Sequence, residues 1–171
     1  MPLQFKADTA KELVFEHVAE YLHRQQLKFI KEDSSRPWGG FFVLDESETD
    51  RFIELYFPTL KKRGLTTPAK LSPKLLIVAP GKRLSWQYHH RRSELWKLIG
   101  GTAGIITSNN DTENDQRLIM PDETIHLEEG ERHRLIGLDN WGIVAEIWQH
   151  SDASNPSDEE DIVRVQDDFG R

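Results

Sequence analysis

Apolar residues recur at two different spacings along this chain, and the change of spacing divides the chain into two parts. From residue 9 to about residue 26 the spacing is helical, with apolar positions at Leu13, Val14, Val18, Tyr21 and Leu22. Thr9 and Glu12 match a capping box, the S/T-x-x-E pattern of a helix start. We therefore predict one amphipathic helix, within an N-terminal segment 1–34 that packs on a larger body formed by residues 35–171.

The larger body carries short apolar or alternating runs that Gly, Pro, Asn and Asp separate. The runs are GGFFVLDE, DRFIELYF, PKLLIVAP, ELWKLIG, TAGIIT, QRLIM, ETIHLEE and WGIVAEIWQ. Many short strands with turns between them predict an all-β sandwich or closed barrel, and the helical crossovers of a parallel sheet are missing. The pair Gly100-Gly101 lies between two of these runs and predicts a tight hairpin.

Three polar segments predict connections between the elements. TSNNDTENDQ favours a hairpin tip, and KKRGLTTPAK, within residues 58–72, favours a basic loop. HSDASNPSDEED predicts a solvated linker to a charged tail.

Composition limits the chemistry. The 171 residues contain no cysteine, so any metal site must use nitrogen and oxygen ligands. The net charge of −7 disfavours a nucleic-acid partner, because phosphate attraction requires a basic face. No apolar run reaches the length of a membrane span and no signal pattern opens the chain, so we expect no membrane partner and a cytoplasmic location.

The stretch WQYHHRRSELW, residues 86–96, concentrates candidate ligands. On a strand, Gln87 and His89 share one face, and Glu94 can join them from the next turn or strand. His133 in EEGERHRL offers a fourth ligand from another strand. Such a mixed nitrogen and oxygen set suits one divalent ion: zinc first, or manganese, cobalt, nickel or iron. The spacing alone is weak evidence for a metal, because a polar surface strand that happens to carry histidines is the commoner case.

Four motifs, in order, resemble one family. PGKRLSWQYHHRRSELWKLIGGTA resembles the first cupin motif in the form found in the C-terminal domain of type II mannose-6-phosphate isomerases, and LEEGERHRL is similar to the second. RPWGG resembles the start of that domain, and EEDIVRVQDDFGR resembles its C-terminus. The resemblance spans residues 36–171.

The resemblance implies a cupin double-stranded β-helix, a jelly-roll barrel whose mouth holds a metal, in agreement with the strand pattern. It places Gln87, His89, Glu94 and His133 at the metal positions. Arg91 stands where the family usually has a third histidine, and Glu128 replaces a proline of the second motif. Neither departure removes an expected ligand.

The resemblance also implies an aldose–ketose isomerase that interconverts mannose 6-phosphate and fructose 6-phosphate through an enediol. The alternatives are an isomerase of another phosphosugar, such as a heptose phosphate, or a non-catalytic metal- and sugar-binding module. Arg92 matches the arginine of the family motif and would stabilise an oxyanion or hold a phosphate.

The catalytic base has two candidates. His90 has a suitable pKa, but strand alternation turns it away from the metal face. Glu146 shares a strand face with Val144 and Trp148, and an acid among apolar neighbours is a base candidate. Three further basic residues fall on family positions and could hold a phosphate: Lys74, Arg134 and Arg164.

In many relatives this domain is the tail of a nucleotidyltransferase, whereas here no glycine-rich nucleotide loop precedes it. We therefore expect isomerisation at most. The amphipathic helix and the open strand edges of a cupin predict a homodimer.

Overall fold

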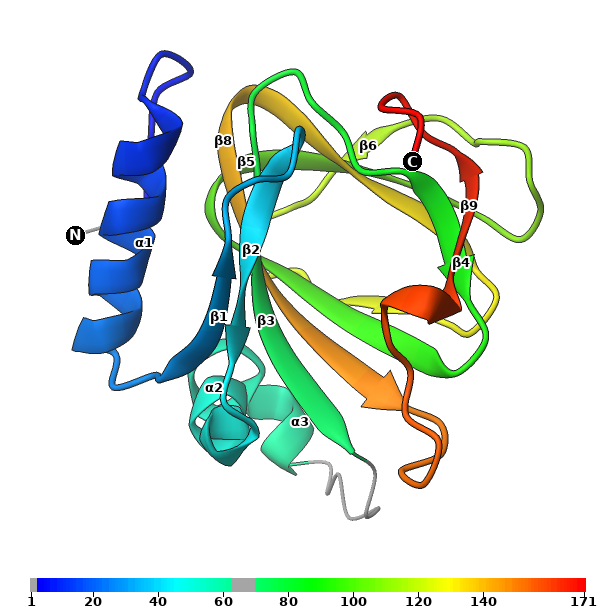
Figure 1. Cartoon of the computed structure of the whole chain (residues 1–171), viewed down its shortest axis with the longest axis horizontal. Helices are drawn as coiled ribbons and strands as arrows, with labels where there is room; N and C mark the ends of the chain where they lie inside the picture. Colours follow the sequence, from blue (N-terminus) through cyan, green and yellow to red (C-terminus); the bar gives the residue numbers. More distant parts are fainter. Residues whose placement is uncertain (1–2, 63–69) are drawn as a thin grey trace.

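The computed structural model describes residues 3–62 and 70–171, and their strands form a barrel (Figure 1). The strands are β1 (Phe29–Asp33), β2 (Gly39–Leu44), β3 (Leu71–Val78), β4 (Trp86–His89), β5 (Arg92–Ser108), β6 (Arg117–Leu118), β7 (Ile125–Leu127), β8 (Arg132–His150) and β9 (Ile162–Gln166). Their order is β1-β2-β3-β8-β4-β9, while β5 pairs with β6, β7 and β8. All pairs between these strands are antiparallel, which confirms the expected all-β barrel.

Strands β3 and β8 are buried on both faces, and this determines what enters the barrel. Leu75 and Ile77 of β3 pack in the core shared with the helices, whereas Leu76 and Val78 pack in the barrel interior. Two-sided burial explains the unbroken apolar run PKLLIVAP. In β8, Val144 lies in the interior cluster, so strand alternation also turns Glu146 and Trp148 inward.

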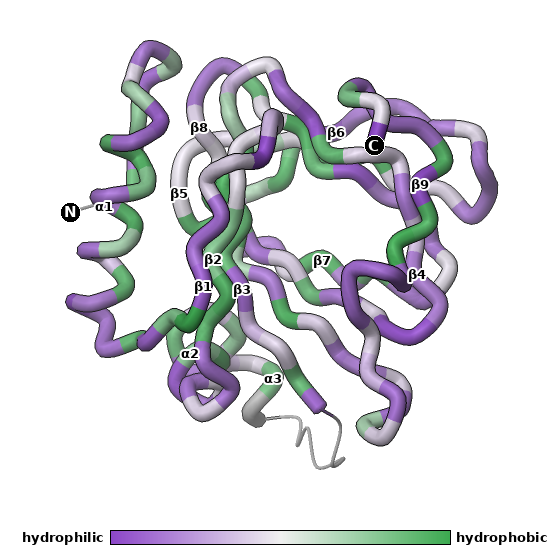
Figure 2. The backbone as a smooth tube through the Cα atoms, viewed as in Figure 1, coloured by the Kyte–Doolittle hydropathy of each residue, from purple (hydrophilic) through white to green (hydrophobic). Residues whose placement is uncertain are grey.

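Helix α1 (Lys11–Arg24) lies along the outside of the barrel (Figure 1) and buries Val14, Phe15, Val18 and Leu22. Its tube is hydrophobic toward the sheet and hydrophilic on the opposite side (Figure 2), which confirms the predicted amphipathic helix. The predicted capping box is wrong. The N-cap is Ala10 and no side chain caps the helix, because the helix begins one residue too late for Thr9 to be the cap.

The run DRFIELYF forms a helix, so the predicted strand is wrong. After a 3₁₀ turn (Glu46–Glu48), α2 (Thr49–Tyr56) buries Phe52, Ile53 and Tyr56, which share one helical face at this spacing. Helix α3 (Pro58–Lys62) follows, so the first part of the segment predicted as a basic loop is helical. Most of that loop, residues 63–69, lies outside the described residues, and β3 begins at Leu71.

The Gly100-Gly101 pair lies inside the continuous strand β5, so the predicted hairpin is wrong. The register with β8 shifts on both sides of the pair, as in a bulge. Gly101 has φ +64°, and a Cβ there would lie 1.7 Å from the Trp141 carbonyl oxygen. The glycines therefore bend a long strand around the barrel. The polar hairpin tip after β5 is confirmed, since Ile105 pairs with Arg117 of β6.

The C-terminal segment after residue 161 is ordered onto the barrel, so the predicted charged tail is a paired strand, whereas residues 151–155 and 158–160 are exposed, as predicted for a solvated linker. Strand β9 pairs with β4 after a 3₁₀ turn (Glu159–Asp161), and this segment runs along the barrel rim (Figure 1). The buried Asp161 carboxylate accepts hydrogen bonds from the backbone N–H groups of His90 (3.1 Å) and Arg91 (2.9 Å) and from the Ser157 hydroxyl. Its pKa lies below the usual value, because these hydrogen bonds outweigh burial, which raises it.

The division into segments 1–34 and 35–171 stays a prediction; β1, in the first segment, pairs with β2, in the second. No helix in the described part of the chain is long and apolar enough to span a membrane.

Candidate metal centre and active site

Two histidines and a glutamate from three strands meet in the barrel. His89 ends β4, Glu94 lies in β5 and His133 in β8, and their candidate ligand atoms all lie within 4.8 Å of one another. The His89 Nε2 is 3.3 Å from the His133 Nε2 and 3.1 Å from Glu94 Oε1, and the second Glu94 oxygen is 3.5 Å from His133 Nε2. All three side chains are at most 2% exposed. Three candidate metal-ligand atoms thus lie close together and are shielded from water.

The protonation state of this cluster suits metal binding. His133 Nδ1 lies 2.9 Å from the Glu131 carbonyl oxygen, which can only accept, so Nδ1 carries the proton and Nε2 keeps a free lone pair. Burial lowers the pKa of His133 to about 4, and the ring is neutral at pH 7. Burial raises the pKa of Glu94, but His89 and the Arg92 guanidinium outweigh it and hold that pKa well below its usual range. A neutral imidazole such as that of His133 and a carboxylate such as that of Glu94 are ligands that divalent ions take.

The histidine from β4 is incompletely satisfied. Among the described residues, His89 Nδ1 is buried with no hydrogen-bond partner. Its Nε2 accepts from Arg92 Nη2 at 3.1 Å. The nitrogen that meets Glu94 and His133 is Nε2, so the orphaned Nδ1 is not an atom that an ion held by this cluster would satisfy.

Gln87 stands beside the cluster. It pairs with His133 in the register between β4 and β8, which puts both side chains on the same face of the sheet. Gln87 is half-buried and lines the pocket next to the cluster, where its Oε1 accepts from the Ser85 hydroxyl at 2.5 Å. The fourth expected ligand therefore adjoins the other three.

Arg92 connects the cluster to the C-terminal segment. It is 1% exposed, and its Nε donates to Glu94 Oε1 at 2.8 Å. Its Nη1 donates to the Ser157 hydroxyl at 2.8 Å, and its guanidinium lies 3.5 Å from the centre of a Trp148 ring. Contacts on every side fix the orientation of this cation.

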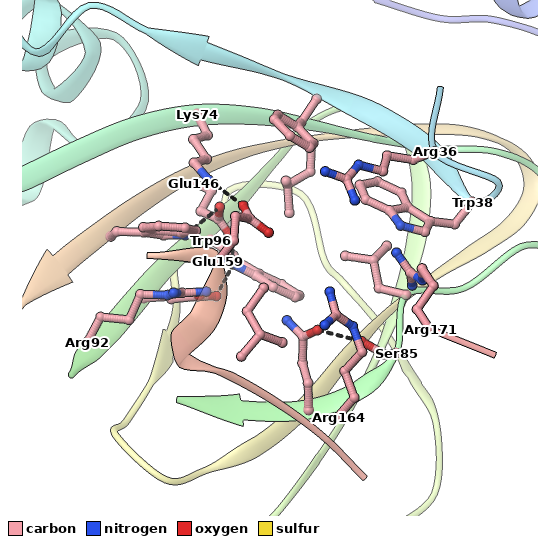
Figure 3. Close-up of a pocket in the computed structure, with 17 residues that line it drawn as sticks. Arg36, Trp38, Lys74, Ser85, Arg92, Trp96, Glu146, Glu159, Arg164 and Arg171 are labelled. Carbon is pink, nitrogen blue, oxygen red and sulfur yellow. Dashed lines mark hydrogen bonds and ion pairs between the residues drawn. The ribbon is translucent and has the colours of Figure 1, made fainter. Parts of the chain in front are cut away.

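The cluster adjoins a pocket in the barrel (Figure 3), because Glu94 belongs to both and Arg92, which donates to Glu94, also lines the pocket. The polar and aromatic lining residues are Arg36, Trp38, Phe41, Lys74, Ser85, Gln87, Arg92, Glu94, Trp96, Glu146, Trp148, Glu159, Arg164 and Arg171. The pocket therefore combines cations, carboxylates and indoles around the candidate metal centre.

Glu146 is the most buried acid of the pocket outside the ligand cluster, at 4% exposure. Each carboxylate oxygen accepts an indole N–H at 2.8 Å, one from Trp96 and one from Trp148. The Trp96 indole nitrogen is also 3.1 Å from Glu94 Oε2. Burial, followed by the negative charge of Glu94, raises the pKa of Glu146 to about 8. This carboxyl group gains and loses a proton near neutral pH.

Lys74 lies opposite Glu146 in the register between β3 and β8. Its Nζ is 3.4 Å from the centre of a Trp148 ring and 3.7 Å from Glu159 Oε1. Burial lowers the pKa of Lys74, and the nearby Glu146 carboxylate opposes that shift. The expected phosphate-binding lysine is thus within the pocket, but its ammonium group already lies beside the Glu159 carboxylate and a Trp148 ring.

Two expected site residues lie away from the pocket lining. The His90 side chain is exposed and packs edge-on against Tyr88, on the face that alternation predicted. Arg134 is buried elsewhere, where it donates to the Leu84 carbonyl oxygen, Glu113 and Gln166. Since Arg134 follows His133 on β8, alternation turns it to the opposite face of the strand. This placement corrects the assignment of Arg134 to a phosphate.

The pocket residues that sequence reasoning missed as site residues include Trp96, Trp148, Arg36, Glu159 and Arg171. Trp96 and Trp148 each follow a glutamate, Glu94 or Glu146, by two residues, so strand alternation puts each indole on the same face as that glutamate. Arg36 opens RPWGG and Arg171 closes DDFGR, so the motifs that carried the resemblance held the signal for both.

A family model described as "Mannose-6-phosphate isomerase C-terminal" matches residues 45–167, most of the chain. The chain belongs to this family. The mannose-1-phosphate guanylyltransferase ManC of Salmonella typhimurium is 30% identical over 118 residues, which are 69% of this chain and 23% of that protein. The alginate biosynthesis protein AlgA of Pseudomonas putida is 33% identical over 135 residues, 75% of this chain and 26% of that protein. The chain thus spans about a quarter of the length of these relatives.

Solved structures agree on the fold. The capsular polysaccharide assembling protein CapF of Staphylococcus aureus has a TM-score of 0.52 and 16% identity over 82% of this chain and 34% of that chain. An oxalate oxidase in complex with glycolate has a TM-score of 0.50 and 19% identity over 78% of this chain and 58% of that chain. The cupin barrel with an N-terminal helix is confirmed.

Proposed function

We propose that the chain is a metal-dependent aldose–ketose isomerase acting on a phosphosugar, with mannose 6-phosphate and fructose 6-phosphate as the first candidate pair. One observation carries the proposal. A buried acid that titrates near neutral pH, Glu146, shares the Trp96 indole N–H with a metal-ligand candidate, Glu94, in one pocket. Proton transfer between two neighbouring carbons requires a base beside a centre of positive charge.

Gln87, His89, Glu94 and His133 would hold the ion. Zinc is the first candidate, and manganese, cobalt, nickel and iron take the same ligand types. A divalent ion held there would supply Lewis acidity that stabilises the developing enediolate.

Glu146 is the proposed base. Its ionised carboxylate removes the proton from C2 of the open-chain aldose and returns it to C1, while a second proton passes from the C2 hydroxyl to the C1 oxygen. Both carboxylate oxygens accept indole N–H groups, so Trp96 and Trp148 fix its orientation. Lys74 across the ladder favours the ionised form. Arg92 keeps its charge throughout and would stabilise the developing enediolate rather than carry a proton.

Two alternatives compete with this proposal. The first is isomerisation of another phosphosugar, such as a heptose phosphate, because hydroxyl recognition depends on the pocket and Arg91 replaces a family histidine. The second is a binding module that keeps metal and sugar affinity without turnover.

The homodimer stays a prediction, and β1, which pairs only with β2 among the described strands, is an edge at which copies could meet.

The decisive experiment follows the transferred proton. Metal-loaded protein is incubated with mannose 6-phosphate that carries deuterium at C2, and NMR follows the label. We expect the label to exchange into solvent or to move to C1 as fructose 6-phosphate forms, and Glu146→Gln to abolish this at unchanged metal content. Label that stays at C2 in every aldose phosphate of a panel, while the sugars still bind, would favour the binding module. Movement in another phosphosugar alone would change the substrate and keep the mechanism.

A further inference from the structure

Three arginines from distant parts of the chain line one end of the pocket. Arg36 lies between β1 and β2, Arg164 lies in β9, and Arg171 is residue 171 of the sequence. Figure 3 shows the three guanidinium groups gathered beside Trp38 and Ser85, away from Lys74, Glu146 and Arg92 at the other end. The fold therefore brings positive charge together opposite the proposed base.

The three charges are neutralised unequally. Arg36 Nε lies 3.0 Å from Asp33 Oδ2, and Arg171 forms a two-point ion pair with Asp167 at 2.9 and 3.0 Å. Arg164 forms no such pair among the described residues, and its Nε is buried without a hydrogen-bond partner. Burial, followed by repulsion from Arg171, lowers the pKa of Arg164, which still remains a cation.

Nearby carboxylates leave this charge uncompensated. Asp167 and Glu159 are the acids that act on Arg164, but Asp167 is paired with Arg171 and Glu159 lies 3.7 Å from Lys74. Arg164 is half-buried, and a guanidinium whose Nε–H is buried without a partner is costly unless an anion satisfies it. Planar guanidinium groups also match the oxygens of a phosphate in two-point hydrogen bonds.

We propose that Arg36, Arg164 and Arg171 form the subsite for the substrate's phosphate, and that the pocket accepts sugars whose phosphate is on the terminal carbon remote from the reacting pair. The anion part stands on the three arginines alone. The sugar part rests on the proposed isomerase function, because the reacting carbons must lie at Glu146. A 1-phosphate would put its phosphate beside the carbons that react, at the wrong end of the pocket.

The anion part is tested with inorganic phosphate. Isothermal titration calorimetry compares the full chain as purified with Arg164→Gln, and chloride at equal ionic strength serves as the blank. Because Arg164→Gln removes the uncompensated guanidinium and breaks no ion pair, we expect phosphate affinity to fall about tenfold or more. Arg24→Gln is the matched control, since it removes the same charge from an exposed site on α1 and should bind phosphate as wild type does.

A second variant protects the test against a folding defect. Arg171→Gln changes the last residue of the sequence and should also weaken phosphate binding, while Arg164→Lys should restore only part of it, because lysine lacks the planar fork. Equal phosphate affinity of wild type and Arg164→Gln would overturn the subsite. So would a wild type that binds no phosphate at millimolar concentrations.

Kinetics separates the subsite from the isomerase proposal. With mannose 6-phosphate, Arg164→Gln should raise KM about tenfold or more and change kcat little, because the phosphate is held equally in the ground state and the transition state. Mannose 1-phosphate should neither turn over nor compete as well as the 6-phosphate. Turnover with an unchanged KM in Arg164→Gln would refute the subsite and keep the isomerase. Phosphate binding that depends on Arg164, without turnover of any sugar, would keep the subsite and refute the isomerase.

Discussion

Lys74 and Glu146 lie directly opposite each other in the antiparallel ladder between β3 and β8, and both are buried, at 7% and 4% exposure. Burial moves both groups toward their neutral forms: it lowers the pKa of Lys74 and raises that of Glu146. Each charge favours the other, so the pair sets the pH at which Glu146 becomes a base.

Replacing Lys74 by methionine should therefore move the pH profile. A base acts when deprotonated, so kcat/KM should rise with pH through the pKa of Glu146. Losing the lysine cation removes an interaction that lowers this pKa, and the rising limb should shift to higher pH. Steady-state rates measured across pH in Lys74→Met and wild type check this. A limb that stays in place would mean that another group is the base.

Metal content should depend on the histidine cluster. His89→Ala and His133→Ala each remove one converging nitrogen and should lose most of about one ion per chain, measured by elemental analysis after dialysis. His90→Ala is the matched control, because His90 neighbours His89 but is exposed outside the pocket lining, and it should keep its metal. Full retention in both cluster variants would show that the ligand assignment is wrong.

Arg92→Ala should cut kcat/KM about a hundredfold or more, the usual cost of losing one oxyanion donor. Arg92→Lys should recover only part of this, because lysine keeps the charge but cannot contact Glu94 and Ser157 together. The wild-type rate in Arg92→Ala would remove the residue from the mechanism. Metal analysis and circular dichroism of the variants distinguish lost chemistry from lost metal or fold, because Arg92 also contacts His89.

Asp161 should make the chain sensitive to acid. Its pKa is held below the usual aspartate value of about 3.9, so the stabilisation is present above that pH and is lost as pH falls through the folded-state value. Asp161→Asn should lower the free energy of unfolding at pH 7 by roughly 1–3 kcal/mol, because it weakens bonds to two backbone N–H groups and to Ser157. The gap between variant and wild type should shrink below about pH 4. Urea titrations at pH 7 and pH 3 measure it, and a gap independent of pH would contradict this role.

The sequence predicted the barrel because strand alternation is local, whereas the grouping of His89, Glu94 and His133 from three strands rested on the family resemblance. Alternation alone put Gln87 and His89 on one strand face, and it put Glu146, Val144 and Trp148 on another. In the structure, each of these groups faces the barrel interior. Sequence reasoning failed where tertiary contacts decide. DRFIELYF became a helix because Phe52, Ile53 and Tyr56 pack together in the core outside the barrel. The arginine subsite depends on Arg36 and Arg171, and no local pattern brings residues so distant in sequence together.

The misassigned Gly100-Gly101 pair yields the last prediction. Gly101 combines φ +64° with a backbone oxygen 1.7 Å from the site of a Cβ, whereas Gly81 has φ +67° and nothing within 4 Å. Gly81→Ala should therefore cost only the conformational strain, about 1 kcal/mol. Gly101→Ala adds a clash with the Trp141 carbonyl that only movement of β5 or β8 relieves, and it should cost roughly 3 kcal/mol or more. Because β5 carries Glu94 and β8 carries His133, Gly101→Ala should also lower metal affinity, which Gly81→Ala should leave unchanged. Thermal unfolding and metal titration of both variants test this, and equal losses in the two would mean that the bulge is not what holds the two long strands in register.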